Sequence, residues 1–186
     1  RYVYIFINGV RRGVVYTDSQ EPTSSDYLSG WFDGADEGDL YKIDDWFEFD
    51  DSVTREFNID GTLQNFTTSG GEKKKARYRW SWEKRSNRGY NDDFTSLFQL
   101  VDAVNTADND AYTQAVTSLV DVEQWLRVFF VRHVVGDWDG YGYVRGKNMS
   151  TYQVPNGQFH MLLWDLDFSL GGGSDGPTAD MFAADR

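Results

Sequence analysis

The sequence has no cysteine, three prolines, two histidines and no apolar run long enough to cross a membrane. Without cysteine, the chain excludes disulfide bonds, thiol catalysis and cysteine-based zinc sites. A membrane-spanning helix needs about 18 or more apolar residues in succession, so we expect no membrane span. The histidines, His133 and His160, fall in a predicted helix and a predicted strand, and they do not suggest a zinc site.

Basic residues are also scarce relative to acidic ones. Thirty Asp and Glu against 18 Lys and Arg give a formal net charge of −12. A charge of this sign repels nucleic-acid backbones, so we expect no nucleic-acid partner. The excess of Asp is typical of a solvated surface in salty or extracellular surroundings, and we expect an extracellular, cell-surface or envelope location. The chain starts inside a strand pattern and closes on a glycine-rich stretch, which we interpret as a segment of a longer protein.

Short strands are predicted for the first half of the chain, approximately residues 1–90. Residues 2–7 and 10–16 form a predicted hairpin around Asn8-Gly9, the preferred two-residue turn. After a loop rich in Ser, Asp and Gly, further strands are expected in "GDLYKIDDWFEFDD" and "REFNIDGTLQNF". The segment "KKKARYRWSWEKR" alternates at Tyr78, Trp80 and Trp82, which favours a basic edge strand over an acidic-ligand site.

Helical spacing appears after residue 91. A first helix is indicated over 94–104, a second near Asp110, and a third from Asp121 to about Gly136, with Gln124 placed to complete a capping box. The third helix is expected to bury Val122, Trp125, Leu126, Phe129 and Phe130. A hairpin of residues 149–165 follows, turning at 155–157. The order of strands, helices and hairpin predicts an α+β fold with two lobes, divided near residue 90.

Acidic side chains and one amide gather at the ends of the predicted elements. Asp137 and Asp139 follow the third helix, Asn148 precedes the hairpin, and Asp165 and Asp167 end its second strand. Oxygen ligands of this kind suit Mg²⁺ or Ca²⁺ rather than a softer metal. Each acid also has a structural interpretation, because Asp commonly caps helices and forms turns.

Four motifs in one order resemble the spore-coat-protein-H (CotH) kinase family. They are "FINGVRRGVVYTD", "GDLYKID", "GDWDGYGYVRGKNMSTY" and "LLWDLDFSLGG", and they extend from Tyr2 to about Gly171. The resemblance implies an atypical protein-kinase-like domain, present here as a partial domain over residues 1–186. It also implies transfer of the γ-phosphoryl group of ATP to a Ser or Thr hydroxyl of a protein substrate, with Mg²⁺ or Mn²⁺ as cofactor and Ca²⁺ as an alternative ion.

By this resemblance, each candidate residue has a role. Asp165 and Asp167 would be metal ligands, and Asn148 would also hold the metal. Asp139 would orient or deprotonate the acceptor hydroxyl, because phosphoryl transfer depends on positioning and charge neutralisation. The family usually has Asn where this chain has Asp137, and Asn148 lies farther from Asp139 than in the kinase catalytic loop.

The resemblance also implies that Lys42, in "LYK", neutralises the α- and β-phosphates. The alternative is a solvated lysine beside Asp44 and Asp45. After Gly13 the family commonly has Thr-Glu, whereas this chain reads "TDSQEP". The resemblance therefore leaves two alternatives: Gln20 or Glu21 takes that place, or the carboxylate partner of Lys42 lies elsewhere. Gln20 is thus a candidate residue for nucleotide binding.

Two other classes of function remain open. A catalytically inactive relative would be a surface or adhesion module that keeps the fold and binds a divalent cation. A sugar-binding domain would use exposed tryptophans as stacking faces, and the candidates are Trp31, Trp46, Trp80 and Trp82.

Overall fold

A computed structural model gives the architecture of an α+β protein with antiparallel strand pairing. It describes residues 2–17, 21–23, 25–44, 48–49, 55–56, 61–86, 92–137, 139–142, 146–166, 168–170 and 178. The chain forms two compact units, residues 1–36 and residues 37–186. None of the helices in the described ranges is both long and apolar enough to span a membrane.

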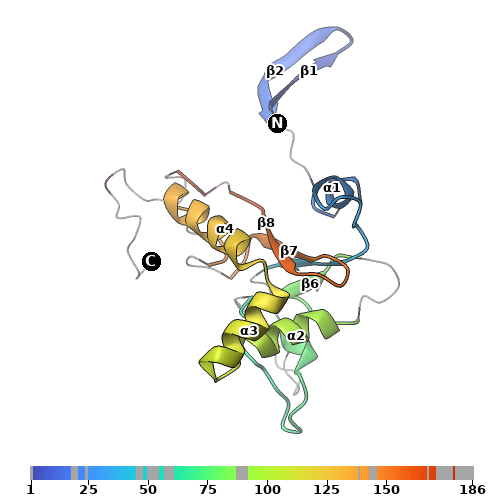
Figure 1. Ribbon diagram of the computed structural model, residues 1–186. Helices are drawn as coiled ribbons and strands as arrows, with labels where there is room; N and C mark the ends of the chain where they lie inside the picture. The colour runs from blue at the N-terminus through green and yellow to red at the C-terminus, as the bar shows by residue number, and fades with distance from the viewer. Residues whose placement is uncertain are drawn as a thin grey trace. The chain divides into compact units, whose positions relative to one another are not determined.

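The first unit contains a hairpin and a short helix. Strands β1 (Tyr2–Ile7) and β2 (Val10–Thr17) pair antiparallel, as predicted (Figure 1). Asn8 and Gly9 both have positive φ, 50° and 76°, which is the backbone that a two-residue type I′ turn requires. Helix α1 (Ser25–Trp31) occupies part of the segment for which a loop was expected, and that expectation was wrong there.

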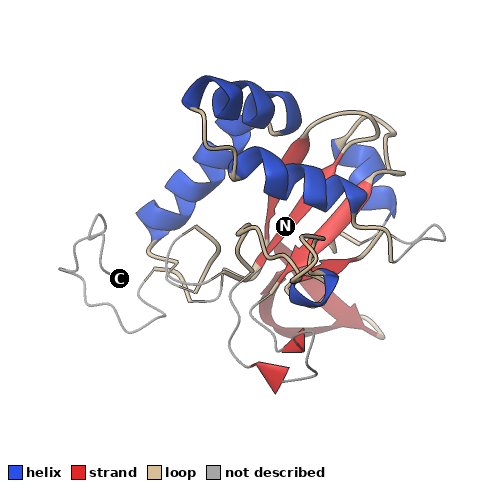
Figure 2. Cartoon of the chain, turned by 90° about the horizontal axis from the view of Figure 1, so that it is seen from below, coloured by secondary structure: helices blue, strands red, loops and turns tan. Residues whose placement is uncertain are grey.

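A four-stranded sheet organises the second unit. Its order is β6 (Trp82–Lys84), β3 (Asp39–Ile43), β7 (Met149–Gln153) and β8 (Phe159–Leu163), all antiparallel. Figure 2 shows the strands in red and the helices in blue. Strands from both sides of residue 90 therefore share one sheet. A separate two-stranded sheet consists of β4 (Glu48–Phe49) and β5 (Arg55–Glu56).

The basic segment before β6 is not the continuous strand that its alternation predicted. A 3₁₀ helix, η1 (Lys75–Arg77), and turns precede the short edge strand β6. Tyr78 and Trp82 are buried, because the amide of Trp82 donates to the carbonyl of Tyr78 in a helical turn that directs both rings inward. Trp80 remains exposed. The tertiary contacts of Tyr78 with Gln64 thus override a period-2 pattern.

The three helices of the second unit lie close to the predicted ranges. They are α2 (Thr95–Val104), α3 (Asn109–Leu119) and α4 (Val122–Val135), and α4 packs beside β8 (Figure 1). The core lies between these helices and the sheet and is formed by large buried side chains, among them Tyr41, Ile43, Trp82, Leu97, Leu100, Val101, Trp125, Met149, Phe159 and Met161. Gly136, with φ 64°, ends α4 as predicted.

The N-terminus of α4 is capped differently from the prediction. Asp121 accepts a hydrogen bond from the amide of Gln124, which is one half of a capping box. The side chain of Gln124 instead bonds the amide and carbonyl of Met161. Gln124 therefore fastens the helix to the neighbouring strand β8.

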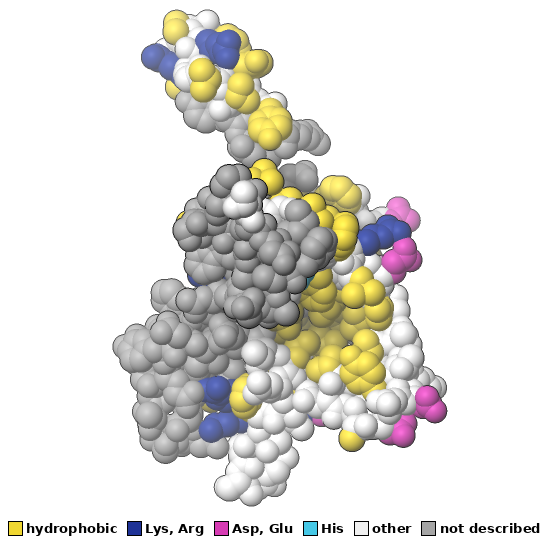
Figure 3. All heavy atoms as spheres, turned by 90° about the vertical axis from the view of Figure 1, so that its left-hand side faces the viewer, with side chains coloured by type: hydrophobic (Ala, Val, Ile, Leu, Met, Phe, Trp, Pro, Cys, Tyr) yellow, Lys and Arg dark blue, Asp and Glu magenta, His cyan; other side chains and the backbone are white. Residues whose placement is uncertain are grey.

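Helix α4 buries a narrower face than predicted. Trp125, Val128 and Arg132 are buried, whereas Leu126 is 60% exposed and Phe130 is 62% exposed. Positions 125, 128 and 132 follow helical spacing and define the inner face, so positions 126 and 130 face outward. Figure 3 shows one face of the molecule, on which hydrophobic side chains, drawn in yellow, lie close together.

Candidate functional site

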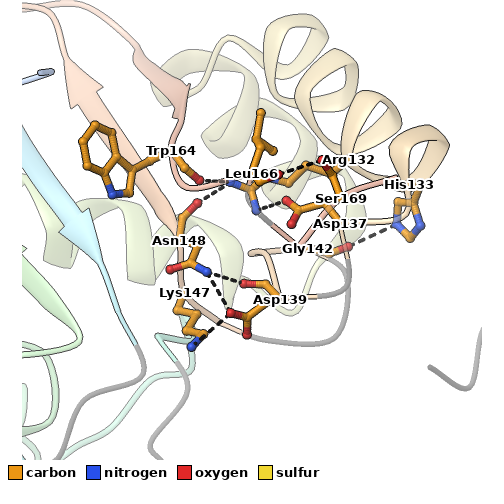
Figure 4. Close-up of polar contacts among 10 residues, drawn as sticks. All are labelled: Arg132, His133, Asp137, Asp139, Gly142, Lys147, Asn148, Trp164, Leu166 and Ser169. Carbon is orange, nitrogen blue, oxygen red and sulfur yellow. Dashed lines mark hydrogen bonds and ion pairs between the residues drawn. The ribbon is translucent and has the colours of Figure 1, made fainter. Parts of the chain in front are cut away.

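Three segments meet at the open end of the β7–β8 hairpin. Met149 pairs with Leu163 in the last pair of the ladder, so Asn148 and Trp164 stand beside each other where it stops. The loop after α4 brings Asp139 to the same place, where Asn148 contacts it (Figure 4). The end of the hairpin and the acidic loop after α4 therefore lie side by side.

Asp139 is held by two neighbouring residues. It is only 6% exposed. The Asn148 Nδ2 donates to the Asp139 carbonyl at 2.9 Å and to its Oδ2 at 3.1 Å. The Lys147 Nζ lies 3.2 Å from the same Oδ2. Neither of these side-chain contacts involves the other carboxylate oxygen, Oδ1.

Asn148 and Asp165 share an unusual backbone conformation. Both have φ 55°, in the left-handed region that Asn and Asp tolerate better than other side chains. Asn148 directly precedes β7, Asp165 lies two residues after the end of β8, and each is a predicted metal ligand. Asp165 is exposed, whereas Asn148 is buried. Other Asn and Asp residues of the chain, Asn8, Asp33 and Asn156, have the same conformation in turns or loops.

Arg132 is a central residue of the site that the sequence analysis did not identify. Its side chain is fully buried, and Nη1 donates to Asp137 Oδ2 at 2.5 Å. Nη2 donates to the carbonyls of Asn148 and Trp164 (Figure 4). The sequence offers one signal for this residue: Arg132 lies seven residues after Trp125, on the inner face of an apolar helix. A buried arginine must have polar partners, so such a position indicates a polar contact.

The electrostatic surroundings of Arg132 bring together the acids of the site. Burial lowers the pKa of Arg132 below its ordinary value, while Asp137, Asp165 and Asp139 act in the opposite direction. The carboxylates of two candidate residues therefore lie within electrostatic reach of one guanidinium. Asp137, which stands where the family usually has Asn, serves as the buried counter-ion of this arginine.

Two of the predicted metal ligands, Asn148 and Asp165, carry oxygen atoms that a hard cation could bind. Asn148 donates through Nδ2, and its amide oxygen Oδ1 is the atom that a metal would bind; Asp165 supplies an exposed carboxylate. Among the residues that the structure describes, no group of three or more His, Cys, Asp or Glu side chains is arranged around a metal position. Carboxylate and amide oxygens are ligand types that Mg²⁺ and Mn²⁺ accept. Asp167 lies outside the described residues.

Lys42 is the last residue but one of β3, the strand that pairs with β7 of the hairpin. It is opposite Ser150 of β7, and its Nζ is 2.9 Å from Asp44 Oδ2. The structure thus places Lys42 two residues along the ladder from Asn148 and gives it the Asp44 partner that the alternative interpretation anticipated. Gln20, the other predicted nucleotide-binding residue, lies outside the described residues.

Of the candidate stacking tryptophans that the structure describes, one is unavailable for sugar binding. Trp82 is fully buried in the core, while Trp31 and Trp80 are exposed on different compact units. Trp46 lies outside the described residues. The stacking hypothesis therefore loses Trp82.

In this α+β fold, the end of the β7–β8 hairpin is a polar, oxygen-rich site. It contains the buried residues Asp139, Asn148 and Arg132. The family model described as "CotH kinase protein" matches residues 1–185. The chain therefore belongs to the CotH kinase family, as its motifs predicted. No curated protein and no solved structure matches it significantly.

Proposed function

We propose that this chain is an ATP-dependent protein kinase with a kinase-like two-lobed fold. It would transfer the γ-phosphoryl group to a Ser or Thr hydroxyl of a protein substrate. Membership of the CotH kinase family supports this proposal. The observation that carries it is the buried Asp139 carboxylate, held on one oxygen by Asn148 and Lys147 at the end of the hairpin that also carries Asp165.

Asp139 would act on the acceptor hydroxyl. Its Oδ2 is occupied by Asn148 Nδ2 and Lys147 Nζ, which fix the orientation of the carboxylate. Oδ1 would accept the hydroxyl hydrogen bond and take the proton as the oxygen attacks. A positioned carboxylate of this kind is the usual acceptor-side group in phosphoryl transfer.

The phosphate end of the site would be formed by the hairpin residues and β3. Asn148 Oδ1 and the carboxylates of Asp165 and Asp167 would hold Mg²⁺ or Mn²⁺, which neutralises charge on the nucleotide phosphates when bound. Lys42 would exchange Asp44 for the α- and β-phosphates. Gln20 remains a candidate for nucleotide binding.

The proposal is tested by comparing transfer from ATP that carries an isotopic label at different phosphates. The chain is incubated with Mn²⁺ or Mg²⁺, casein as acceptor, and ATP labelled at either the γ- or the α-phosphate. We expect label in protein from γ-labelled ATP only, in Ser or Thr, and transfer that is lower by about 10²–10⁴-fold in the Asp139→Asn variant. Transfer from α-labelled ATP would identify nucleotidyl transfer and contradict the proposal, as would equal transfer by the variant.

A catalytically inactive surface module that binds a divalent cation is the second candidate. The observation that favours it is the ion pair between Lys42 and Asp44, which gives the proposed phosphate-binding lysine a partner on its own strand. Such a module fits an extracellular or cell-surface location. Tight Ca²⁺ binding without nucleotide, together with no label transfer, would support it.

A further inference from the structure

Arg132 lies where the backbone ladder of the β7–β8 hairpin stops. Beyond the pair of Met149 and Leu163, the carbonyls of Asn148 and Trp164 are both bonded by Arg132 Nη2. One guanidinium nitrogen thus takes the place of the next pair in the ladder. This contact fixes the ends of strands β7 and β8, next to which Asn148 and Asp165 lie.

The other guanidinium nitrogen joins the third segment of the site. Arg132 Nη1 bonds Asp137 Oδ2, and the amide of Asp137 in turn donates to the carbonyl of Arg132 at 3.0 Å. The loop that carries Asp139 is therefore tied at its start to the same side chain. A forked guanidinium can join three segments in this way, whereas a lysine ammonium is a point charge on a flexible stem.

Gly140 shows how closely the loop approaches this side chain. A Cβ built on Gly140 would lie 1.7 Å from Arg132 Nη1 and 2.7 Å from Asp137 Oδ2. A methyl group there must displace the guanidinium or the loop. Gly140→Ala therefore perturbs the position of Arg132 without removing any charged or hydrogen-bonding group.

We propose that Arg132 is a positioning residue that assembles the nucleotide–metal site by joining the Asp139 loop, Asn148 and the segment of Asp165. The role of Arg132 in nucleotide and metal binding rests on the proposed function. The linkage of the three segments rests only on the contacts of Arg132. Residues that orient metal ligands commonly change metal affinity by about 10–100-fold when substituted.

Amide hydrogen exchange measured by NMR tests the linkage without any ligand. Two reporter amides are Tyr141, which donates to Lys147, and Leu170, which donates to Val135. We expect Arg132→Lys and Gly140→Ala to accelerate exchange at both amides by about tenfold or more. The amide of Arg85, which donates to Leu40 at the far side of the sheet, serves as the reference and should keep its rate.

Val128→Ala is the matched control, because Val128 is buried one turn earlier on the same face of α4. It should lower the melting temperature but leave the Tyr141 and Leu170 amides near their wild-type rates. Wild-type exchange in the Arg132→Lys variant, or equal acceleration in Val128→Ala, would overturn the proposed linkage.

Ligand affinity provides the functional readout. Electron paramagnetic resonance measures the Kd of Mn²⁺ in the presence of a non-hydrolysable ATP analogue. We expect Arg132→Lys and Gly140→Ala to raise this Kd by about 10–100-fold and Val128→Ala to change it by about twofold or less. Unchanged affinity in folded Arg132→Lys would contradict the positioning role. If the wild-type chain does not bind Mn²⁺ with the analogue, the proposed function fails, and hydrogen exchange still decides the linkage.

Discussion

At the scale of single residues, the site separates acceptor-side and phosphate-side groups. Asp139 is buried and fixed through Oδ2 by two donors. Asp165 is exposed at the end of β8 and has a left-handed backbone. The two carboxylates therefore occupy different environments, although both act on Arg132. Different environments for two acids are consistent with different chemical roles.

The first prediction separates these roles by mutation. Asp139→Asn keeps the side-chain shape and removes the base, so transfer should fall by about 10²–10⁴-fold while the Kd of the nucleotide changes little. Asp165→Asn combined with Asp167→Asn should instead weaken binding of Mn²⁺ with an ATP analogue. Transfer rates and calorimetric Kd values measure the two effects. Loss of nucleotide binding in Asp139→Asn alone would show that the roles are wrongly assigned.

At the scale of secondary-structure elements, α4 links the core to the site. Its inner face packs Trp125 and Val128 in the core and ends in Arg132, which reaches the hairpin end. Its outer face exposes Leu126 and Phe130. A substitution in α4 should therefore act according to the face on which it lies.

The second prediction compares two apolar residues of α4. Val128→Ala should lower the free energy of unfolding by about 1–2 kcal/mol, because it removes buried methyl groups and leaves a cavity. Leu126→Ala should change it by about 0.5 kcal/mol or less, because the side chain is exposed and alanine favours the helix. Urea unfolding followed by circular dichroism measures both. A large loss in Leu126→Ala would contradict this division of the helix into two faces.

The start of α2 gives a third prediction, which concerns pH. Asp93 Oδ1 accepts the amide of Thr95 at 2.9 Å, and hydrogen bonds from Thr95 lower the pKa of Asp93 below its ordinary 3.8. Because the pKa of Asp93 is lower in the folded protein than in the unfolded chain, its ionised carboxylate stabilises the fold at pH values above 3.8. This stabilisation is lost as the pH falls below 3.8. Asp93→Ala should therefore cost up to about 1 kcal/mol at neutral pH, since the side chain is exposed, and less in acid.

Asp93→Asn is the control for this pH effect. Asparagine keeps an oxygen that can accept the Thr95 amide but cannot ionise, so its advantage over alanine should not depend on pH. Unfolding free energies of the three proteins between pH 3 and pH 7 make the comparison. A cost of Asp93→Ala that grows as the pH falls would reverse the expected sign.

At the scale of the whole molecule, strands from the two halves of the sequence form one sheet. β3 pairs with β7 over five residue pairs, which brings Lys42 into the same sheet as the hairpin that carries Asn148. A ligand that spans β3 and the hairpin end would therefore stabilise the second unit as a whole. Its net effect is measurable as a change in melting temperature.

The fourth prediction follows from this coupling. Mn²⁺ with a non-hydrolysable ATP analogue, at about 100 times its Kd, should add about 2.7 kcal/mol of stability, or roughly 5–10 °C in melting temperature. Mn²⁺ alone should give a much smaller shift, because such sites borrow phosphate oxygens. Differential scanning calorimetry measures each condition. An equal shift with Ca²⁺ alone would favour the cation-binding surface module.

The sequence by itself determined the elements whose signals are local. The Asn8-Gly9 turn, Gly136 at the end of α4 and the turn at residues 155–157 depend on conformational preferences of a few adjacent residues. Such preferences do not require distant partners, so they can be read directly. The motif order also identified the family and the candidate residues Asp139 and Asn148, which the structure brings into contact.

Tertiary structure alone decided which side chains are buried and which segments meet. The exposure of Phe130, the loss of alternation at Trp80 and the burial of Arg132 depend on packing against residues far along the chain. The steric demand for Gly140 arises only because Arg132 Nη1 lies where a Cβ would be. These outcomes depend on burial and on partners supplied by other elements, and a local window of sequence contains neither.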